Sequence, residues 1–103
     1  MRQFDVYRNP SARSESRIPF LVALQSHLLA ASHLTVVAPM LPQDDRSALT
    51  EISATVSFKG AEYIVLVVEM AAVETRLLRA PLGDLSNYED DIRRALDRLF
   101  TGF

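Results

Sequence analysis

Cysteine is absent from the 103 residues of this chain, glycine occurs only three times, and Lys59 is its only lysine. Without cysteine, the chain has no disulfide framework and no thiolate that could bind a metal or act as a nucleophile. The three glycines are too scattered to form a loop that holds phosphates. No apolar run approaches the roughly 20 residues that a membrane-spanning helix needs. These absences exclude a disulfide scaffold and a helical membrane protein.

The remaining composition is that of one globular domain covering residues 1–103, with 49% hydrophobic and 23% charged residues. The net charge of −2 argues against a protein that binds nucleic acid by itself, because such proteins usually carry a basic excess. Arginine supplies nearly all of the cationic charge, and it suits bidentate contacts with carboxylates and phosphates. The N-terminal stretch MRQFDVYRNP lacks the uninterrupted apolar segment of a secretory signal. We therefore expect a cytoplasmic protein without membrane contacts.

Most of the chain carries β-strand patterns. Residues 52–58 alternate apolar and polar side chains, and residues 61–70 continue with a run rich in valine. A hairpin is expected between these two stretches, at Lys59-Gly60. Strands are expected at 3–8, after Pro19 within 18–26, at 34–40, at 52–58 and at 61–70, with a further short strand before Pro81. Polar loops are expected at 9–17 and 41–50.

The segment from Ile64 to Val68 is apolar on both faces, which a half-solvated strand does not need. One interpretation is that both faces are buried within a single domain. The other is that one face packs against a second subunit, since oligomerisation supplements a small core. The sequence leaves both interpretations open.

A helical period replaces the β pattern near the C-terminus. Ser86 and Glu89 form a Ser-x-x-Glu capping box, which predicts that Ser86 caps the start of a helix. The apolar positions that recur at helical spacing are Ile92, Ala95, Leu96, Leu99, Phe100 and Phe103. Two acid-then-arginine pairs, Glu89–Arg93 and Asp90–Arg94, are expected on the exposed face. The predicted fold class is mainly β, a small antiparallel barrel or sandwich closed by one amphipathic α-helix.

No arrangement in the sequence indicates catalysis. His27 and His33 lie six residues apart, a spacing that matches no compact metal site. The acidic pairs Asp44-Asp45 and Asp90-Asp91 fall in a loop and on a solvated helix turn. No serine stands in a nucleophile-elbow motif. We expect a protein that is not an enzyme.

Several stretches, taken together and in order, resemble the CcdB toxins of bacterial toxin–antitoxin operons. These are QFDVYRNP at the start, PFLVALQSHLL after the polar loop, VVAPM, the KG turn and the tail DLSNYEDDIRRALDRLFTGF. The resemblance implies an SH3-like barrel with a C-terminal helix, assembled as a homodimer. It also implies a toxin without cofactor or chemistry of its own, which binds the A subunit of DNA gyrase and traps its cleaved complex with DNA. A CcdA-like antitoxin encoded alongside would neutralise it by wrapping the dimer with a disordered segment.

The resemblance places the family's gyrase-contacting tip on Thr101, Gly102 and Phe103. It implies four flanking gyrase contacts, at Leu28, Leu29, Asp97 and Phe100. Thr101 stands where the tip of the family carries an aromatic residue, and His27 stands where an acid is expected.

The expected antitoxin contacts are Arg8, Arg13 and Arg17, in and beside the polar loop at 9–17. An acidic disordered segment would bind such residues because charge-assisted Arg–carboxylate pairs are strong hydrogen bonds. In the homodimer, apolar residues from Ile64 to Met70 and the helix near Leu99 are expected at or near the two-fold axis.

Three functions remain open at this point. The first is a toxin that poisons gyrase. The second is a CcdB-like protein that still binds its antitoxin but has lost gyrase poisoning, because Thr101 replaces the tip aromatic. The third is a sequence-specific ribonuclease on the same barrel, which requires arginine together with an acid or histidine on one face.

Overall fold

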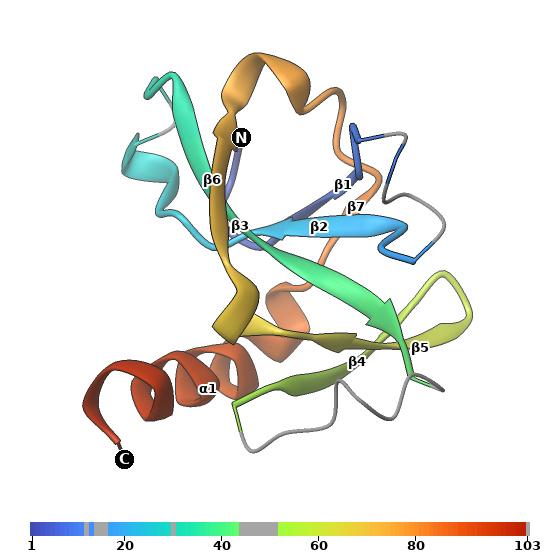
Figure 1. Ribbon diagram of the computed structural model, residues 1–103, viewed down its shortest axis with the longest axis vertical. Coiled ribbons are helices and arrows are strands. Elements are labelled where there is room, and N and C mark those ends of the chain that lie inside the picture. The colour runs from blue at the N-terminus through green and yellow to red at the C-terminus, as the bar shows by residue number, and fades with distance from the viewer. Residues whose placement is uncertain (12, 14–16, 30, 44–51, 103) are drawn as a thin grey trace.

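The computed structural model describes residues 1–11, 13, 17–29, 31–43 and 52–102. Figure 1 shows a curled sheet with one helix packed against it. The strands are β1 Asp5–Arg8, β2 Phe20–Ala23, β3 Leu34–Pro42, β4 Ala54–Phe58, β5 Ala61–Val65, β6 Ala71–Glu74 and β7 Gly83–Asp84. The α-helix is α1, Glu89–Thr101, and the short 3-10 helices include η1 His27–Leu29, η3 Val67–Glu69, η4 Thr75–Leu77 and η5 Ser86–Tyr88.

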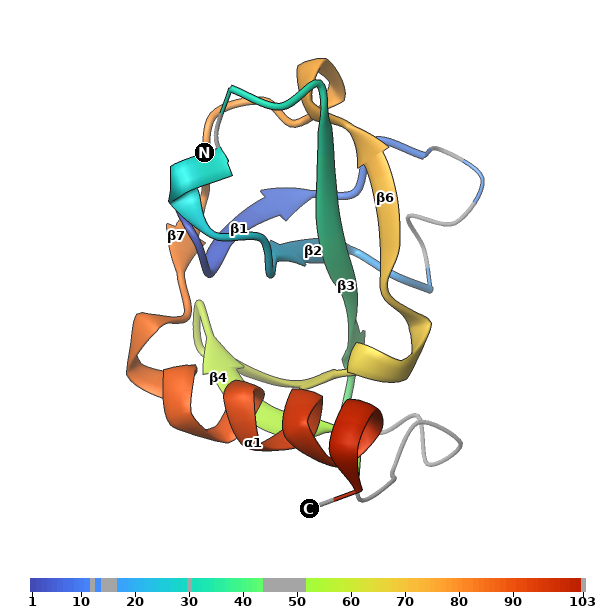
Figure 2. The same ribbon diagram turned by 90° about the vertical axis from the view of Figure 1, so that its left-hand side faces the viewer.

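The long strand β3 organises the sheet. All of the pairs are antiparallel, in the order β4-β5-β3-β2-β1-β7, and β6 also pairs with β3. The start of β3 pairs with β6, its middle with β2, and its end with β5. Because β3 is shared by three partner strands, the sheet curls into a half-barrel. Figure 2 shows α1 beside β4 at the lower end of this half-barrel. The predicted fold class, a mainly β antiparallel barrel with a C-terminal helix, is confirmed in this form; the single domain at 1–103 stays a prediction.

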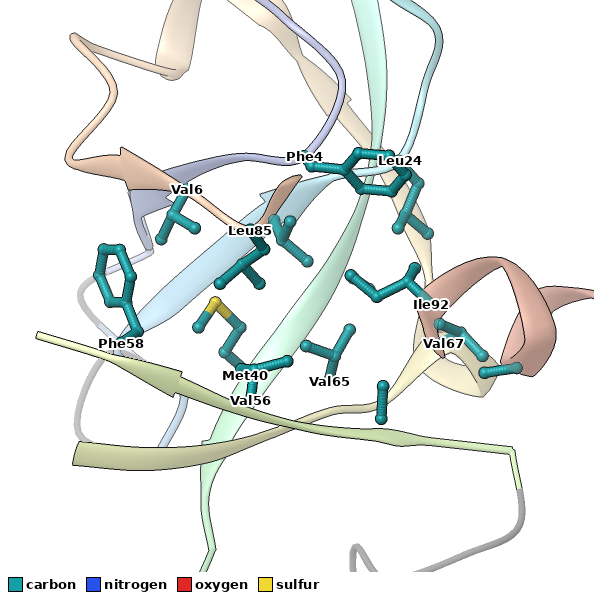
Figure 3. Packing of buried hydrophobic residues seen from close by; sticks show 14 residues of the cluster. Phe4, Val6, Leu24, Met40, Val56, Phe58, Val65, Val67, Leu85 and Ile92 are labelled. Atoms are coloured by element: carbon teal, nitrogen blue, oxygen red, sulfur yellow. The ribbon is translucent and has the colours of Figure 1, made fainter. Parts of the chain in front are cut away.

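The main core lies inside the curl. Along β4, Ala54, Val56 and Phe58 are buried while the two residues between them are exposed, as the period of two predicts. Figure 3 shows side chains from the strands and from α1 meeting in this space. The buried members of the cluster are Phe4, Val6, Val22, Leu24, Ala38, Met40, Ala54, Val56, Phe58, Val65, Val67, Leu85, Ile92 and Ala95.

The doubly apolar segment is buried on both faces within one chain. Val65 and Val67 belong to the main core, whereas Ile64 and Leu66 join a second cluster with Leu41. The interpretation of burial within a single domain is therefore correct as far as residue 67. The predicted strand 61–70 is wrong in its second half, because β5 ends at 65, η3 turns the chain, and β6 begins at 71. A curled sheet needs such a bend where a strand passes from one part of the sheet to the next.

The hairpin predicted at Lys59-Gly60 is confirmed. Both turn residues have positive φ, 50° at Lys59 and 81° at Gly60, as a type I′ turn requires. The other strands differ from prediction mainly at their ends. β1 begins at 5 because Phe4 has a φ of 70°, and β3 runs on to 42. The predicted short strand before Pro81 is present only as the end of β6, and most of the predicted loop at 41–50 lies outside the described residues.

The predicted capping box is wrong. Ser86 begins η5, and α1 starts at Glu89 without a side-chain cap. Instead, Asp84 accepts hydrogen bonds at Oδ1 from the Ser86 hydroxyl at 2.5 Å and from its backbone N–H at 2.9 Å. These bonds, that of the hydroxyl first, hold the pKa of Asp84 below its ordinary value. The Ser86 hydroxyl thus donates to Asp84, and Ser86 lies within η5 instead of at the cap position of α1.

The two ion pairs predicted on α1 have different outcomes. Arg93 lies 3.0 Å from Glu89, as predicted. Arg94 instead pairs with Asp91, at 3.3 Å, and not with Asp90. Residues three apart are neighbours on a helix just as residues four apart are, so the rotamer of the arginine decides between them.

Replacement of Gly83 by alanine should destabilise the fold. A Cβ atom built at this position lies 2.8 Å from the ring of Phe58, which is buried. Overpacking of this kind costs about 1–3 kcal/mol, so thermal unfolding of Gly83→Ala should occur several degrees below that of wild type. In a Phe58→Leu background the same change should cost clearly less. An equal cost in both backgrounds would refute the contact as the cause.

Candidate partner-binding surfaces

The C-terminal end of α1 projects from the molecule. Ile92 and Ala95 are buried, and Leu96 and Leu99 are half-buried. Phe100, however, is 70% exposed, although the apolar period groups it with these residues. At 3.6 residues per turn it lies about 80° around the helix from Ile92, at the margin of the packed face. The prediction that Phe100 belongs to the buried face of the helix is therefore wrong.

The chain leaves this helix in a defined way. Gly102 has a φ of 79°, in the left-handed region that favours glycine, and its N–H donates to the carbonyl of Arg98 at 3.1 Å. The hydroxyl of Thr101 donates to the carbonyl of Asp97 at 2.6 Å. Thr101, Gly102 and Asp97 are exposed, and Phe103 lies outside the described residues. The described part of the predicted tip is therefore a capped helix end in solvent.

Leu28 and Leu29 form a second exposed apolar site, on η1. They are 86% and 56% exposed. Gln25 holds this segment, because its side-chain amide donates to the carbonyls of Leu29 at 3.4 Å and Leu34 at 3.1 Å, and its Oε1 accepts from Val36 N–H at 3.2 Å. The Ser26 hydroxyl also accepts from the N–H of Leu28, at 3.2 Å. Two adjacent leucines held outward in this way mark a candidate contact surface.

The structure does not bring these two sites together within one chain. In Figures 1 and 2, η1 lies in the upper half of the molecule and the end of α1 lies at the bottom, so they are separated along the axis that both views share. A single partner surface that includes both Leu28 and Phe100 would need either a long contact or a second copy of the chain.

The three arginines predicted for the antitoxin are exposed, but they do not form one group. Arg8 lines a hollow of about 320 Å³ together with Asn9, Pro10, Arg76, Leu77 and Arg79. Arg13 and Arg17 do not line it. Sequence reasoning missed Arg76 and Arg79, whose only signal was their spacing of three around two leucines.

Another hollow, of about 330 Å³, gathers charged groups of both signs. Arg2 and His27 line it, but so do Asp5, Asp84 and Glu89. The pKa of Asp84 is lowered, so this carboxylate stays ionised at neutral pH. Asp5 is nearly buried and accepts from Arg2 N–H at 3.1 Å and from the Tyr7 hydroxyl at 3.5 Å. Three carboxylates against one arginine disfavour the binding of an RNA phosphate here.

Tyr7 on β1 completes the polar contact with Asp5. Burial first, and then the charge of Asp5 and its hydrogen bond, raise the pKa of the Tyr7 hydroxyl. The phenol is therefore neutral at physiological pH, and its hydroxyl can donate to the Asp5 carboxylate. Among the described residues, no group of three or more histidine, aspartate or glutamate side chains is placed to hold a metal ion. The part of the chain described here also contains no helix that is long and apolar enough to cross a membrane.

The family model described as CcdB protein matches residues 3–102, nearly the whole chain. The chain belongs to the CcdB family. The predicted resemblance is therefore confirmed. CcdB-family proteins are the toxins of toxin–antitoxin systems, and the family is a non-enzymatic one. No match was found among curated proteins.

Replacement of Phe100 should leave the stability of this CcdB-family protein nearly unchanged. Its ring is mostly exposed, so Phe100→Ser should lower the melting temperature by less than about 2 °C. Ile92→Ala, on the same helix but fully buried, should cost about 2–5 kcal/mol and lower the melting temperature by roughly 10 °C or more. Differential scanning calorimetry measures both. A large loss of stability on replacing Phe100 would contradict the exposed position.

Proposed function

We propose that this protein is the toxin of a type II toxin–antitoxin pair, and that it binds the DNA gyrase A subunit and traps the gyrase–DNA cleavage complex. The observation that carries the proposal is the end of α1, where Phe100 is exposed and Gly102 ends the helix in a left-handed conformation. An exposed aromatic side chain on a rigid helix is a suitable anchor for a protein partner. The gyrase contacts are Asp97, Phe100, Thr101, Gly102 and Phe103, with Leu28 and Leu29. The protein performs no chemistry of its own and acts in the cytoplasm, where gyrase works on DNA.

The active form is an isologous homodimer, which is the commonest closed symmetry. Residues 64–67 are buried within one chain, so they are not available to a second subunit. The exposed Val68 and the half-buried Met70 and Leu99 remain as the apolar contacts near the axis. Since η1 and the end of α1 lie far apart in one chain, a second copy would supply the other half of the gyrase-binding surface.

The specific observation that favours a second candidate function is Thr101. Threonine has no ring that could stack on a partner, and its hydroxyl is already bonded to the helix carbonyl of Asp97. A protein that binds its antitoxin without poisoning gyrase fits this feature. The ribonuclease has less support, because the hollow that gathers Arg2 and His27 carries three carboxylates as well.

A gyrase cleavage assay tests the proposal. Purified protein, gyrase and supercoiled plasmid should give linear DNA after detergent and protease treatment. Deletion of 101–103 should abolish this product, and Phe100→Ala should require roughly tenfold more protein, the scale of a central aromatic anchor.

Leu82→Ala is the matched control, since Leu82 is an exposed apolar residue outside the proposed surface, and it should behave as wild type. Full cleavage by the truncated protein would overturn the proposed tip. If wild type produces no linear DNA but Thr101→Trp does, the protein is the non-poisoning form.

A further inference from the structure

Three arginines from two distant parts of the chain meet at one surface hollow. Arg8 comes from the end of β1, Arg76 comes from η4, and Arg79 comes from the irregular segment after η4. Asn9, Pro10 and Leu77 complete the lining. Arg8 and Arg79 form no ion pair with the residues that the structure describes, and Arg76 pairs with Glu74 on its own segment at 2.5 Å. We call these three side chains the arginine hollow.

Both segments that carry these arginines are fixed to the fold. Thr75, next to Arg76, donates its N–H to the His33 carbonyl at 2.8 Å and shares a 2.7 Å hydroxyl contact with the buried Thr35. Asn9, next to Arg8, is buried and donates its side-chain amide to the Ile18 carbonyl at 2.8 Å. The backbones under the hollow are therefore held in place before any ligand arrives, which lowers the entropic cost of binding.

The charge of the hollow is opposite to that of the whole chain. The protein carries a net charge of −2, yet the arginine hollow is lined by three cations and no acid. Guanidinium groups bind carboxylates through two parallel hydrogen bonds. The Arg76–Glu74 pair is exposed on both sides, so it contributes little stability and can be exchanged for a ligand carboxylate. A ligand with two or more negative groups matches this arrangement.

Apolar surface beside the arginines narrows the ligand class. Leu77 lies in the hollow, and Leu34 lines an adjoining hollow with His33, Glu74 and Arg76. Both leucines are 39% exposed. A phosphate backbone would leave this apolar surface unused, and the net negative charge of the protein opposes a polyanion. An extended peptide in which acids alternate with apolar residues would satisfy both the arginines and the leucines.

We propose that the arginine hollow, Arg8, Arg76 and Arg79, is a docking site for an acidic, leucine-containing peptide segment, and that this segment belongs to the antitoxin. The assignment of this segment to the antitoxin rests on the proposed function. The site replaces the predicted group of Arg8, Arg13 and Arg17, of which only Arg8 is retained.

The test uses full-length protein and three matched double variants. Arg76→Ala/Arg79→Ala, Arg13→Ala/Arg17→Ala and Arg93→Ala/Arg94→Ala each change the net charge from −2 to −4. Two probes are used in fluorescence anisotropy: the purified antitoxin from the adjacent gene, and a labelled 12-residue peptide of alternating Glu and Leu. A Gln-for-Glu peptide and a 12-nucleotide DNA strand serve as comparison ligands. Thermal unfolding verifies that each variant is folded.

The expected result is that the 76/79 variant binds both acidic probes about tenfold more weakly, with a shallower dependence on salt. The other two variants should bind within about twofold of wild type, and the Gln peptide should bind weakly to all. Equal losses in all three variants would show a general charge effect and overturn the site. Tighter binding of DNA than of the Glu peptide would overturn the ligand class.

Different results would contradict the peptide site and the antitoxin assignment. If wild type binds the Glu peptide through the hollow but does not bind the antitoxin, the peptide site stands and the antitoxin assignment is wrong. If wild type binds the antitoxin and the 76/79 variant binds it equally well, the toxin–antitoxin function stands and the site is wrong.

Discussion

The burial of Ile92 against the inside of the curled sheet is the contact on which the rest of the structure depends. Ile92 is fully buried in the same cluster as Met40, Val65 and Leu85, which come from β3, β5 and the segment before α1 (Figure 3). Burying such a side chain contributes about 1.5–3 kcal/mol, a large share of the stability of a domain this small. Without this contact, one end of the half-barrel would be open to water.

The same contact determines what the protein presents to partners. Because Ile92 and Ala95 fix the rotation of α1, Phe100 is turned outward and the helix ends in solvent. The strand β3 has a similar role for the other surfaces, because Thr35 holds Thr75 beside the arginine hollow and Val36 binds Gln25 beside the exposed leucines. Three exposed contact sites are thus carried by one core: the end of α1, the short helix η1, and the arginine hollow at the end of β1 and η4.

The sequence predicted the elements whose signals are local. The alternation along 54–58, the hairpin at Lys59-Gly60 and the apolar stripe of α1 each depend on neighbouring residues alone, and each is present. The break at 66–70 was missed because an apolar run has the same composition whether the strand is straight or bends from β5 into β6. The capping box failed because the 3-10 helix η5 occupies Ser86 to Tyr88, so that α1 begins three residues after the serine.

The candidate surfaces divide in the same way. The exposure of Leu28, Leu29 and Phe100 is consistent with the sites that the family resemblance implied, although the resemblance could not place them at opposite ends of one chain. The arginine hollow was not predictable, because Arg8 and Arg76 are 68 positions apart in the sequence. Their segments meet only through the sheet, in which β6 pairs with β3, β3 with β2, and β2 with β1. Contacts between distant segments carry no local pattern.

Native-state hydrogen exchange tests most directly the claim that α1 is part of the core and thereby fixes the exposed tip. If Ile92 and Ala95 hold the helix as described, the amides of residues 96–99 should open with a free energy within about 1 kcal/mol of that of the β3 amides, because both require global unfolding. Exchange of the helix several kcal/mol more easily than β3, through a separate opening, would show that the helix is only loosely attached and would contradict the account.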